Sequence, residues 1–188
     1  MNDGLPGELD GAGWPGEYVF CPQCGTRLGR SVVDGSERAV CASCSYVHFR
    51  NPAVGAAAIV RDEDGAILLV RRAHGSRKGL WSVPAGFVDY GEDIRDAAAR
   101  ELFEETGLLA EIGPVAFVAS NFHDPAKLTV GVWFHAAVTG GHLEAGDDAT
   151  DARYFALDDL PALAFQTDRE LFAQLLNEAA VQERSTRS

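Results

Sequence analysis

The sequence lacks any apolar run long enough to cross a membrane. A spanning helix needs about 20 consecutive apolar residues, and every hydrophobic stretch of this chain is interrupted well before that length. The first residues, MNDGLPGELDGAGWPGEYVF, also lack the basic residues and the following apolar segment of a secretory signal. We therefore expect a cytoplasmic protein without a membrane partner.

Positive charge is scarce in this chain. Its 188 residues include 16 lysines and arginines against 28 aspartates and glutamates, which gives a formal net charge of −12. An acidic surface does not attract nucleic acid or an anionic membrane, so neither is an expected partner. An anionic substrate would need positive charge placed locally.

Cysteine is limited to four residues, Cys21, Cys24, Cys41 and Cys44, in the pattern C-x2-C-x16-C-x2-C. This spacing is typical of a zinc ribbon, because each C-x2-C turn aims two thiolates at one point and two such turns enclose a tetrahedral Zn²⁺. The alternatives are four ordinary thiols or two disulfides, which a reducing cytosol disfavours. Four thiolates leave no open coordination position, so we expect a structural zinc.

The length of the chain suits a small ribbon followed by one larger domain. We predict a disordered tail over residues 1–18, the ribbon over 19–50, the larger domain with a C-terminal helix over 51–183, and a second disordered tail over 184–188. The tails are predicted from their polar composition, which offers little to bury.

The apolar pattern of the larger domain predicts an α+β fold. Strands are expected at 53–60, 66–72, 114–120, 127–138 and 152–157, with a short strand between 79 and 87 that Pro84 and Gly86 interrupt. One helix is expected between Glu92–Asp93 and Gly107, and a second from about 168 to 182. Strands and helices without a regular βαβ rhythm favour a mixed sheet with helices packed on it.

The first helix carries an unusual concentration of acid. Glu101, Glu104 and Glu105 lie within one and a half turns, and at 100° per residue they share a face with Ile94 and Ala97. A solvated acidic face is the alternative, but such a face would lie opposite the apolar residues. Carboxylates that point toward the protein favour a hard cation with oxygen ligands, Mg²⁺ or Mn²⁺.

This stretch resembles the signature of the Nudix hydrolases, G-x5-E-x7-R-E-U-x-E-E-x-G-U, where U is aliphatic. Its nine specified positions, here called the box, are filled by Gly86, Glu92, Arg100, Glu101, Leu102, Glu104, Glu105, Gly107 and Leu108. The resemblance implies the Nudix fold, a mixed β-sheet sandwiched between helices. It also implies hydrolysis of a diphosphate that links a nucleoside to another group. Relatives that share the four-cysteine ribbon include NADH pyrophosphatases and enzymes that cleave FAD or ADP-ribose.

The resemblance implies roles for the box residues. Mg²⁺ (or Mn²⁺) would be held by Glu101, Glu104, Glu105 and the backbone carbonyl of Ala85. Glu92 and Arg100 would pair and hold the preceding loop on the helix. A surface bridge from Arg100 to Glu104 is the alternative for that arginine.

The general base is open between a box carboxylate and an acid on a later loop. Glu101 is the first choice within the box. Among the acids of the glycine-rich stretch GGHLEAGDDATDARYF, Asp148 and Asp151 are the better candidates, because relatives often carry a carboxylate shortly before a strand such as RYF. Acids in such a loop can also be merely solvated.

Phosphate binding would need the one basic cluster of the chain, RRAHGSRKG. It contributes Arg71, Arg72, Arg77 and Lys78, which either guide the phosphates of a substrate or form a solubilising turn. Phe87 and Tyr90 lie in the loop before the helix and are the preferred candidates for stacking on a base.

The substrate is less well specified than the reaction. NADH pyrophosphatases carry S-Q-P-W-P-F-P-x-S after the box, whereas this chain has SNFHDPAKL at 120–128, which disfavours NADH. Pro125 and the segment LDDLPALAF favour the relatives that act on ADP-ribose or FAD. We expect a small nucleoside diphosphate derivative, ADP-ribose before FAD and NADH, with release of AMP by a homodimer. A nucleotide-sugar sensor without activity and an enzyme acting on capped RNA are the alternatives.

Overall fold

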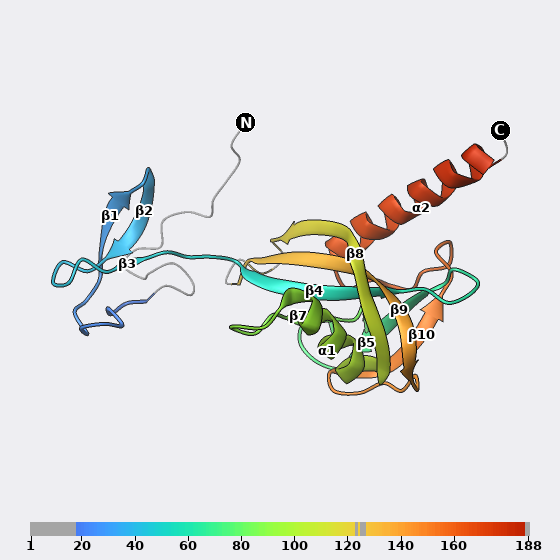
Figure 1. Cartoon of the computed structure of the whole chain (residues 1–188). Coiled ribbons are helices and arrows are strands. Elements are labelled where there is room, and N and C mark those ends of the chain that lie inside the picture. Colours follow the sequence, from blue (N-terminus) through green and yellow to red (C-terminus); the bar gives the residue numbers. More distant parts are fainter. Residues whose placement is uncertain (1–17, 123, 125–126, 187–188) are drawn as a thin grey trace. The chain divides into compact units, whose positions relative to one another are not determined.

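The computed structural model describes residues 18–122, 124 and 127–186 (Figure 1). The contacts between residues divide the chain into two compact units. The described residues of the first are those up to Pro52 together with Asp124 and Lys127, and the second begins at Ala53. The predicted N-terminal tail lies outside the described residues apart from Tyr18, and so do Pro125 and the last two residues of the predicted C-terminal tail. No helix in the described ranges combines the length and apolar character needed to cross a membrane.

The first unit is a small antiparallel sheet of three strands, β1 (Gly29–Val33), β2 (Ser36–Val40) and β3 (Val47–His48), with β2 in the centre. Asp34 and Gly35 connect β1 to β2, and both have positive φ, as the two-residue turn of a twisted hairpin requires. Few of its side chains are buried, namely Cys21, Ala39 and Cys41. A core of this size cannot stabilise a fold without a further link between its parts.

The second unit contains two sheets. The first is mixed and has the order β7-β4-β9-β8, formed by Ala85–Phe87, Ala53–Val60, Thr129–Gly141 and Leu108–Asn121. Strands β4 and β9 are parallel, and the other pairs of this sheet are antiparallel. The second sheet is antiparallel with the order β10-β5-β6, formed by Ala149–Phe155, Ile67–Arg72 and Trp81–Ser82.

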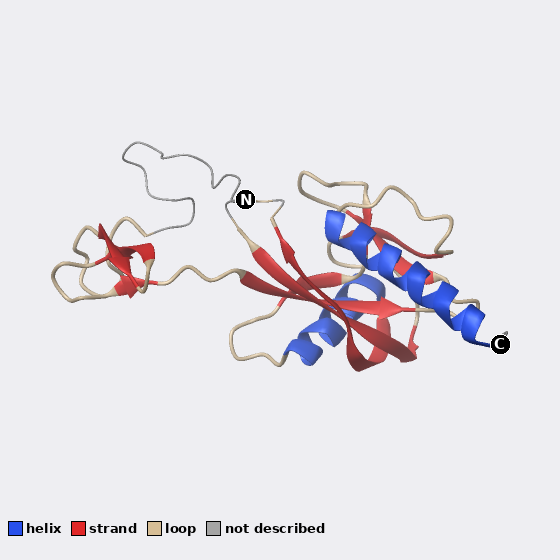
Figure 2. Ribbon diagram, turned by 90° about the horizontal axis from the view of Figure 1, so that it is seen from above, coloured by secondary structure: helices blue, strands red, loops and turns tan. Residues whose placement is uncertain are grey.

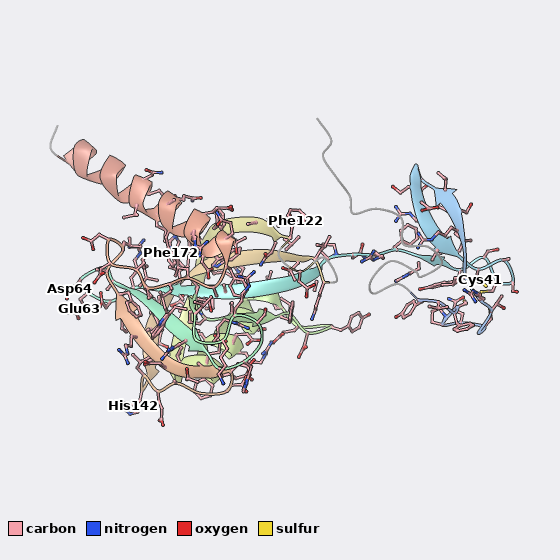
Figure 3. The ribbon with its side chains drawn as sticks, turned by 180° about the vertical axis from the view of Figure 1, so that it is seen from behind. Cys41, Glu63, Asp64, Phe122, His142 and Phe172 are labelled. Atoms are coloured by element: carbon pink, nitrogen blue, oxygen red, sulfur yellow. The ribbon has the colours of Figure 1, made fainter. Side chains whose placement is uncertain are left out.

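Two helices cover opposite faces of the strands, α1 (Ile94–Thr106) and α2 (Gln166–Thr186), as Figures 1 and 2 show. Strand β4 explains the arrangement, because successive side chains of a strand point to opposite faces. Ile59 packs in a core with Leu171 and Phe172 of α2, whereas Val60 packs with Leu102 of α1. Figure 3 shows Phe172 where α2 meets the sheet. The predicted α+β fold, with a mixed sheet between helices, is confirmed.

Some predicted boundaries were wrong. Strand β8 begins at Leu108, directly after the first helix, and not at 114, because shifts in its pairing with β9 accommodate the irregular segment around Gly113 and Pro114. Strand β10 covers Ala149–Phe155 and not 152–157. Helix α2 continues to Thr186, so residues 184–186, predicted as part of a tail, are helical.

Candidate active site and zinc centre

The four cysteines gather into one metal-binding cluster. Their sulfur atoms all lie within 4.8 Å of one another, and none forms a disulfide. Cys21 and Cys44 have Sγ atoms 3.6 Å apart, and Cys24 and Cys41 have theirs 3.4 Å apart. Zn–S bonds of about 2.3 Å in a tetrahedron place sulfurs about 3.8 Å apart, so the cluster fits zinc.

Two matching backbone turns position the sulfurs. The amide of Gly25 donates to the carbonyl of Cys21, and the amide of Ser45 donates to the carbonyl of Cys41, over 2.9 and 3.0 Å. Gly25 and Ser45 both adopt positive φ, at the same place in each turn. Local geometry thus builds each half of the site, and the metal would link the halves.

Replacing Cys41 by Ser is expected to unfold the first unit and leave the second unit folded. The reason is that the first unit has almost no core apart from its cysteines, while the second has its own cores. Zinc content by atomic absorption and ¹H–¹⁵N NMR would show loss of zinc and collapse of the ribbon signals alone. Unchanged ribbon signals after complete zinc loss would contradict this prediction. The exposed Ser43→Ala is a matched control within the same knuckle.

Helix α1 is fixed at both ends by the expected caps. Asp93 caps its start, accepting a hydrogen bond from the amide of Arg95 over 2.8 Å, and Gly107 ends it in the left-handed conformation. The loop after β9 then covers the end of the helix, because the amides of Glu144 and Gly146 donate to the carbonyls of Thr106 and Glu105. This loop includes His142, labelled in Figure 3. The acids that follow it are thereby brought to α1.

Arg100 joins the acids of the box. Its guanidinium donates to both carboxylate oxygens of Glu92, at 2.8 and 2.9 Å, and to the carbonyl of Phe87 at 3.1 Å. It also donates to Glu101 at 2.8 Å and to Glu104 at 3.1 Å. Arg100 therefore makes both contacts weighed from the sequence, and it holds the loop on the helix. The hydrogen bonds from Arg100, with one from the amide of Asp89, lower the pKa of Glu92 to about 2.

Glu105 is the most deeply placed acid of α1, with 5% of its surface exposed. Its carboxylate accepts a hydrogen bond from the amide of Ala85 over 3.0 Å, so the contact with Ala85 shown here is through the amide and not the carbonyl. Burial, with the repulsion of Glu101 and Asp148, raises the pKa of Glu105 to about 8. Burial also raises the pKa of Glu101, against the opposing effect of Arg100.

The absence of a side chain at Gly86 leaves room for the Glu101 carboxylate. A Cβ atom at position 86 would lie 2.0 Å from the carboxyl carbon of Glu101, so any side chain there would displace that carboxyl group. The first glycine of the box is therefore required for the close approach of an acid to the backbone, and not for an unusual φ.

The acids of the later loop separate into two groups. Asp147 and Asp148 act electrostatically on Glu101 and Glu105 respectively, so the structure brings them to the box. Asp151 instead accepts a hydrogen bond from Arg153 over 3.0 Å. Its neighbour Ala152 packs in the core on the α1 side, which places Asp151 on the opposite face of β10.

The four residues of the predicted phosphate-binding cluster also separate into two pairs with different surroundings. The guanidinium groups of Arg72 and Arg77 each lie 5.2 Å from the centre of the Phe165 ring, and Arg77 also donates to the carbonyl of Ala164. Arg71 is exposed and donates to the carbonyl of Gly79, and Lys78 is exposed. Among the four, Arg72 is the residue that acts electrostatically on Glu105.

The two predicted stacking residues, Phe87 and Tyr90, are exposed, Tyr90 completely so. The sequence interpretation did not single out Phe165 or Asp168, which the structure places around Arg72. Asp168 stands in the first turn of α2, where an acid is ordinary, and only its burial distinguishes it. Nothing in the sequence pattern could have revealed that burial.

The box acids have the chemistry of a site for a hard divalent cation. They offer carboxylate oxygens, and a cation would favour the ionised form of the buried Glu105. They are not gathered as tightly as the cysteines, which are the only cluster of potential ligand atoms within 4.8 Å of one another in residues 18–122, 124 and 127–186. Arg100 binds both Glu101 and Glu104, so these two carboxylates have a cationic partner within the protein.

Comparison with known families matches both parts of the chain. Residues 51–175 match the family described as NUDIX domain, and residues 19–50 match the zinc-ribbon family described as Nudix N-terminal. A solved NUDIX hydrolase from Nitrosomonas europaea is similar with a TM-score of 0.76 and 28% identity, covering 86% of this chain and 92% of that one.

Two curated relatives carry more specific names. A protein of Methanocaldococcus jannaschii named ADP-ribose pyrophosphatase is 38% identical over 125 residues, which cover 66% of this chain and 73% of that protein. A protein of Stutzerimonas stutzeri named NAD-capped RNA hydrolase NudC is 33% identical over 152 residues, covering 80% of this chain and 52% of that protein. The chain thus spans about half the length of the second relative.

Proposed function

Because the chain belongs to the Nudix hydrolase family, in its zinc-ribbon-bearing pyrophosphohydrolase group, we propose that it hydrolyses the diphosphate of an adenine nucleotide derivative and releases AMP. The observation that carries the proposal is the arrangement of the box. Arg100 binds Glu92, Glu101 and Glu104 while Glu105 is buried against Ala85, so every acid of the box is held in a defined place.

The proposed ligands of Mg²⁺ or Mn²⁺ are Glu101, Glu104 and Glu105, with the backbone carbonyl of Ala85. When bound, such an ion neutralises phosphate oxygens and lowers the pKa of a coordinated water. A second ion is compatible with three carboxylates. The side chains of this chain then have two remaining tasks, which are to position the diphosphate and to accept a proton.

The proton acceptor is proposed to be Glu101, with Asp148 as the alternative on the later loop. In the reaction, the oxygen of water forms a bond to phosphorus, the bridging P–O bond breaks, and one water proton passes to the carboxylate. Asp148 remains a candidate because it acts on Glu105 electrostatically. Asp151 is a weaker candidate since it binds Arg153 on the other face of β10.

The proposed role of Arg72 is to attract and orient the phosphates. It is the basic residue of the predicted cluster that acts on Glu105, so its charge reaches the acids of the box. Arg77 lies on the same aromatic ring as Arg72, while Arg71 and Lys78 would contribute from the exposed rim. Local positive charge thus offsets the acidity of the chain as a whole.

ADP-ribose is the first proposed substrate, followed by FAD and then NADH. The archaeal relative named ADP-ribose pyrophosphatase supports this order, as does the absence of the NADH pyrophosphatase motif after the box. The test is a panel of dinucleotides and nucleotide sugars with Mg²⁺, Mn²⁺ or chelator, with products identified by mass spectrometry. We expect AMP and the phosphorylated remainder, and failure to split any member would contradict the proposal.

Capped RNA is a second candidate substrate because of the relatives named NAD-capped RNA hydrolase NudC. The first unit supports contact with RNA through Arg27, Arg30, Arg38 and Arg50, against two acids, Asp34 and Glu37, in residues 18–52. Capped and uncapped RNA of equal length distinguish the candidates. Faster release of the cap nucleotide than of AMP from ADP-ribose would favour RNA. Binding of ADP-ribose without any cleavage would instead favour the sensor alternative.

We also propose that the chain forms a two-fold dimer in the cytoplasm. Strand β8 lies at one edge of its sheet and exposes Leu109, Val115 and Val118, and exposed apolar edge strands commonly pair. Light scattering at micromolar concentration is expected to give about twice the 20.1 kDa of one chain. A mass of one chain would contradict this, and Val118→Lys should shift the mass from two chains to one.

A further inference from the structure

The segment that leads into α2 brings an aromatic ring and a carboxylate to Arg72. This segment, residues 162–168, is here called the entry segment. It is fixed beside β6, because the amide of Trp81 donates to the carbonyl of Ala162 over 3.0 Å and the amide of Ala164 donates to the carbonyl of Trp81 over 2.7 Å. Strand β5, which ends at Arg72, pairs with β6. The end of β5 therefore meets the entry segment.

Phe165 contributes the aromatic ring. It is half-buried, and the guanidinium groups of Arg72 and Arg77 both lie 5.2 Å from its centre. Arg77 also donates to the carbonyl of Ala164, within the entry segment. A guanidinium attracted to a ring face has fewer positions open to it than one in water. The ring thus restricts the side chain of Arg72.

Asp168 contributes the carboxylate, and 2% of its surface is exposed. The indole of Trp133 and the amide of Val83 are the hydrogen-bond donors that act on it, and Arg72 acts on it by charge. Burial raises the pKa of Asp168 to about 7, and these three partners oppose that rise. A buried carboxylate needs such partners, so Asp168 is held in one place by several elements of the fold.

Arg72 and Asp168 each keep a buried polar atom without a hydrogen bond. The Nε of Arg72 and the Oδ2 of Asp168 make none within residues 18–122, 124 and 127–186. The Nε1 of Trp133 is also outside strict hydrogen-bond geometry, so its contact with Asp168 is a loose one. A buried donor and a buried acceptor both lose free energy of solvation while they stay unpaired. Closing the Nε of Arg72 onto Asp168 would satisfy both.

Arg72 is attracted by one carboxylate from each helix. Glu105 of α1 and Asp168 of α2 both interact with its charge. The amides of Val83 and Ala85, which act on Asp168 and Glu105 respectively, are two residues apart, a span of no more than about 7 Å. With Glu105 engaged by the proposed cation, Asp168 remains as the anion that can hold the arginine.

We infer that Asp168 and Phe165 are positioning residues for Arg72. Asp168 accepts from the Nε of the guanidinium and Phe165 supports its face, so the Nη groups point to the diphosphate of the substrate. A guanidinium presents its donors in a fixed plane, and binding is stronger when that plane is set beforehand. Neither positioning residue touches the substrate. The inference rests on the proposed function for the role of Arg72.

The first test measures binding without turnover. Methylenediphosphonate, which has no P–O–P bond to hydrolyse, is titrated with Mg²⁺ into the full-length protein by calorimetry, at about pH 8.5, where Asp168 is ionised. Asp168→Asn removes a negative charge, which would tighten the binding of an anion if Asp168 acted by charge alone. We expect the opposite, binding at least about fivefold weaker, because Arg72 loses its fixed orientation.

The Nε–H signal of Arg72 in ¹H–¹⁵N NMR gives a second readout, identified by its loss in Arg72→Lys. We expect methylenediphosphonate to shift this signal in the wild-type protein. Asp168→Asn should speed its hydrogen exchange at least about tenfold. Thr167→Val, a buried neighbour in the same turn, and Glu170→Gln, an exposed change of the same charge, are the matched controls. Both should leave the affinity and the signal unchanged.

Kinetics on ADP-ribose shows whether the positioning residues act through Arg72. Asp168→Asn and Arg72→Lys should each lower kcat/KM at least about tenfold, and the double variant should fall less than about twofold below Arg72→Lys, since residues that act as a unit are not additive. Phe165→Leu should weaken diphosphonate binding and lower kcat/KM in the same direction. Phe165→Tyr keeps the ring and should retain both. If Asp168→Asn does not fold, Phe165→Leu serves for the same measurements.

The outcomes separate the possibilities. Tighter or unchanged diphosphonate binding by Asp168→Asn, or an additive double variant, would overturn the inference. A lower melting temperature with unchanged affinity would show that Asp168 serves the fold alone. If ADP-ribose is cleaved and Arg72→Lys has no effect, the inference is wrong and the proposed function stands. If nothing is cleaved while the affinity and the Arg72 signal change as expected, the inference stands and the proposed reaction fails.

Discussion

Glu105→Gln is expected to lower kcat for the preferred substrate by about two to three orders of magnitude. The amide keeps the shape of the side chain and still accepts the hydrogen bond that Ala85 donates, but it removes the charge of one proposed metal ligand. Steady-state kinetics with Mg²⁺ would measure the loss. Glu111→Gln, which removes one exposed charge from β8, is the matched control and should retain wild-type turnover.

Without metal, Glu105→Gln should be at least as stable as the wild-type protein, although its turnover is lower. The pKa of Glu105 in the folded protein is raised to about 8, above its value in the unfolded chain. The folded state therefore binds more protons between about pH 4.5 and 8, so metal-free stability falls as pH rises through that window. Glu105→Gln should remove this fall and melt at an equal or higher temperature at pH 8. Wild-type turnover or a lower metal-free melting temperature would contradict the assigned role.

Gly86→Ala is expected to abolish most activity with little loss of stability. The new Cβ would occupy the place of the Glu101 carboxyl group, 2.0 Å away, and that carboxyl is the mobile end of a side chain that can turn aside. The backbone at Gly86 does not adopt positive φ, so alanine causes no strain there. We expect kcat to fall by about two orders of magnitude while the melting temperature changes by only a few degrees.

Gly140→Ala provides the matched control for that substitution. It adds the same atom to a strand of the same sheet, where the nearest contact would be an ordinary 3.9 Å to Leu109. Both variants should be compared by thermal unfolding and by kinetics on one substrate. Equal activities in the two variants would show that the position of Glu101 is unimportant, and an unfolded Gly86→Ala would show that the glycine serves the fold.

The helix of the box was predictable because its determinants are local. Asp93 and Gly107 are caps that act within one turn, and the spacing of three glutamates fixes their common face. The prediction that all three glutamates point toward the protein was only partly correct. Glu105 is buried and Glu101 is half-buried, whereas Glu104 is exposed beside Arg100. Helical spacing gives the direction of a side chain, whereas its depth depends on what packs against it.

The acids of the later loop show what sequence could not provide. Asp148 and Asp151 are three residues apart, and only the pairing of β10 with β5 decides which face each one joins. Asp148 precedes the regular part of that pairing and acts electrostatically on Glu105, while Asp151 binds Arg153. Long-range register is set by the whole sheet and not by nearby residues.

The proximity of Asp168 and Trp133 was still harder to predict from nearby residues. They belong to α2 and β9, and each has an ordinary place in its own element. Their meeting beneath Arg72 depends on the packing of three separate segments, which no local pattern encodes. The zinc cluster is the contrasting case, because its ligands come from two short turns whose spacing is visible in the chain.

The most direct test of the central claim is mass spectrometry of the products formed from ADP-ribose in water enriched in oxygen-18. With Mg²⁺, the wild-type protein should yield AMP and ribose 5-phosphate, with one oxygen-18 atom incorporated into one of the two. Chelator or Glu105→Gln should suppress both products. Intact ADP-ribose in the presence of Mg²⁺, or equal turnover with chelator, would contradict the assignment of the box acids as the metal-binding centre of a pyrophosphohydrolase.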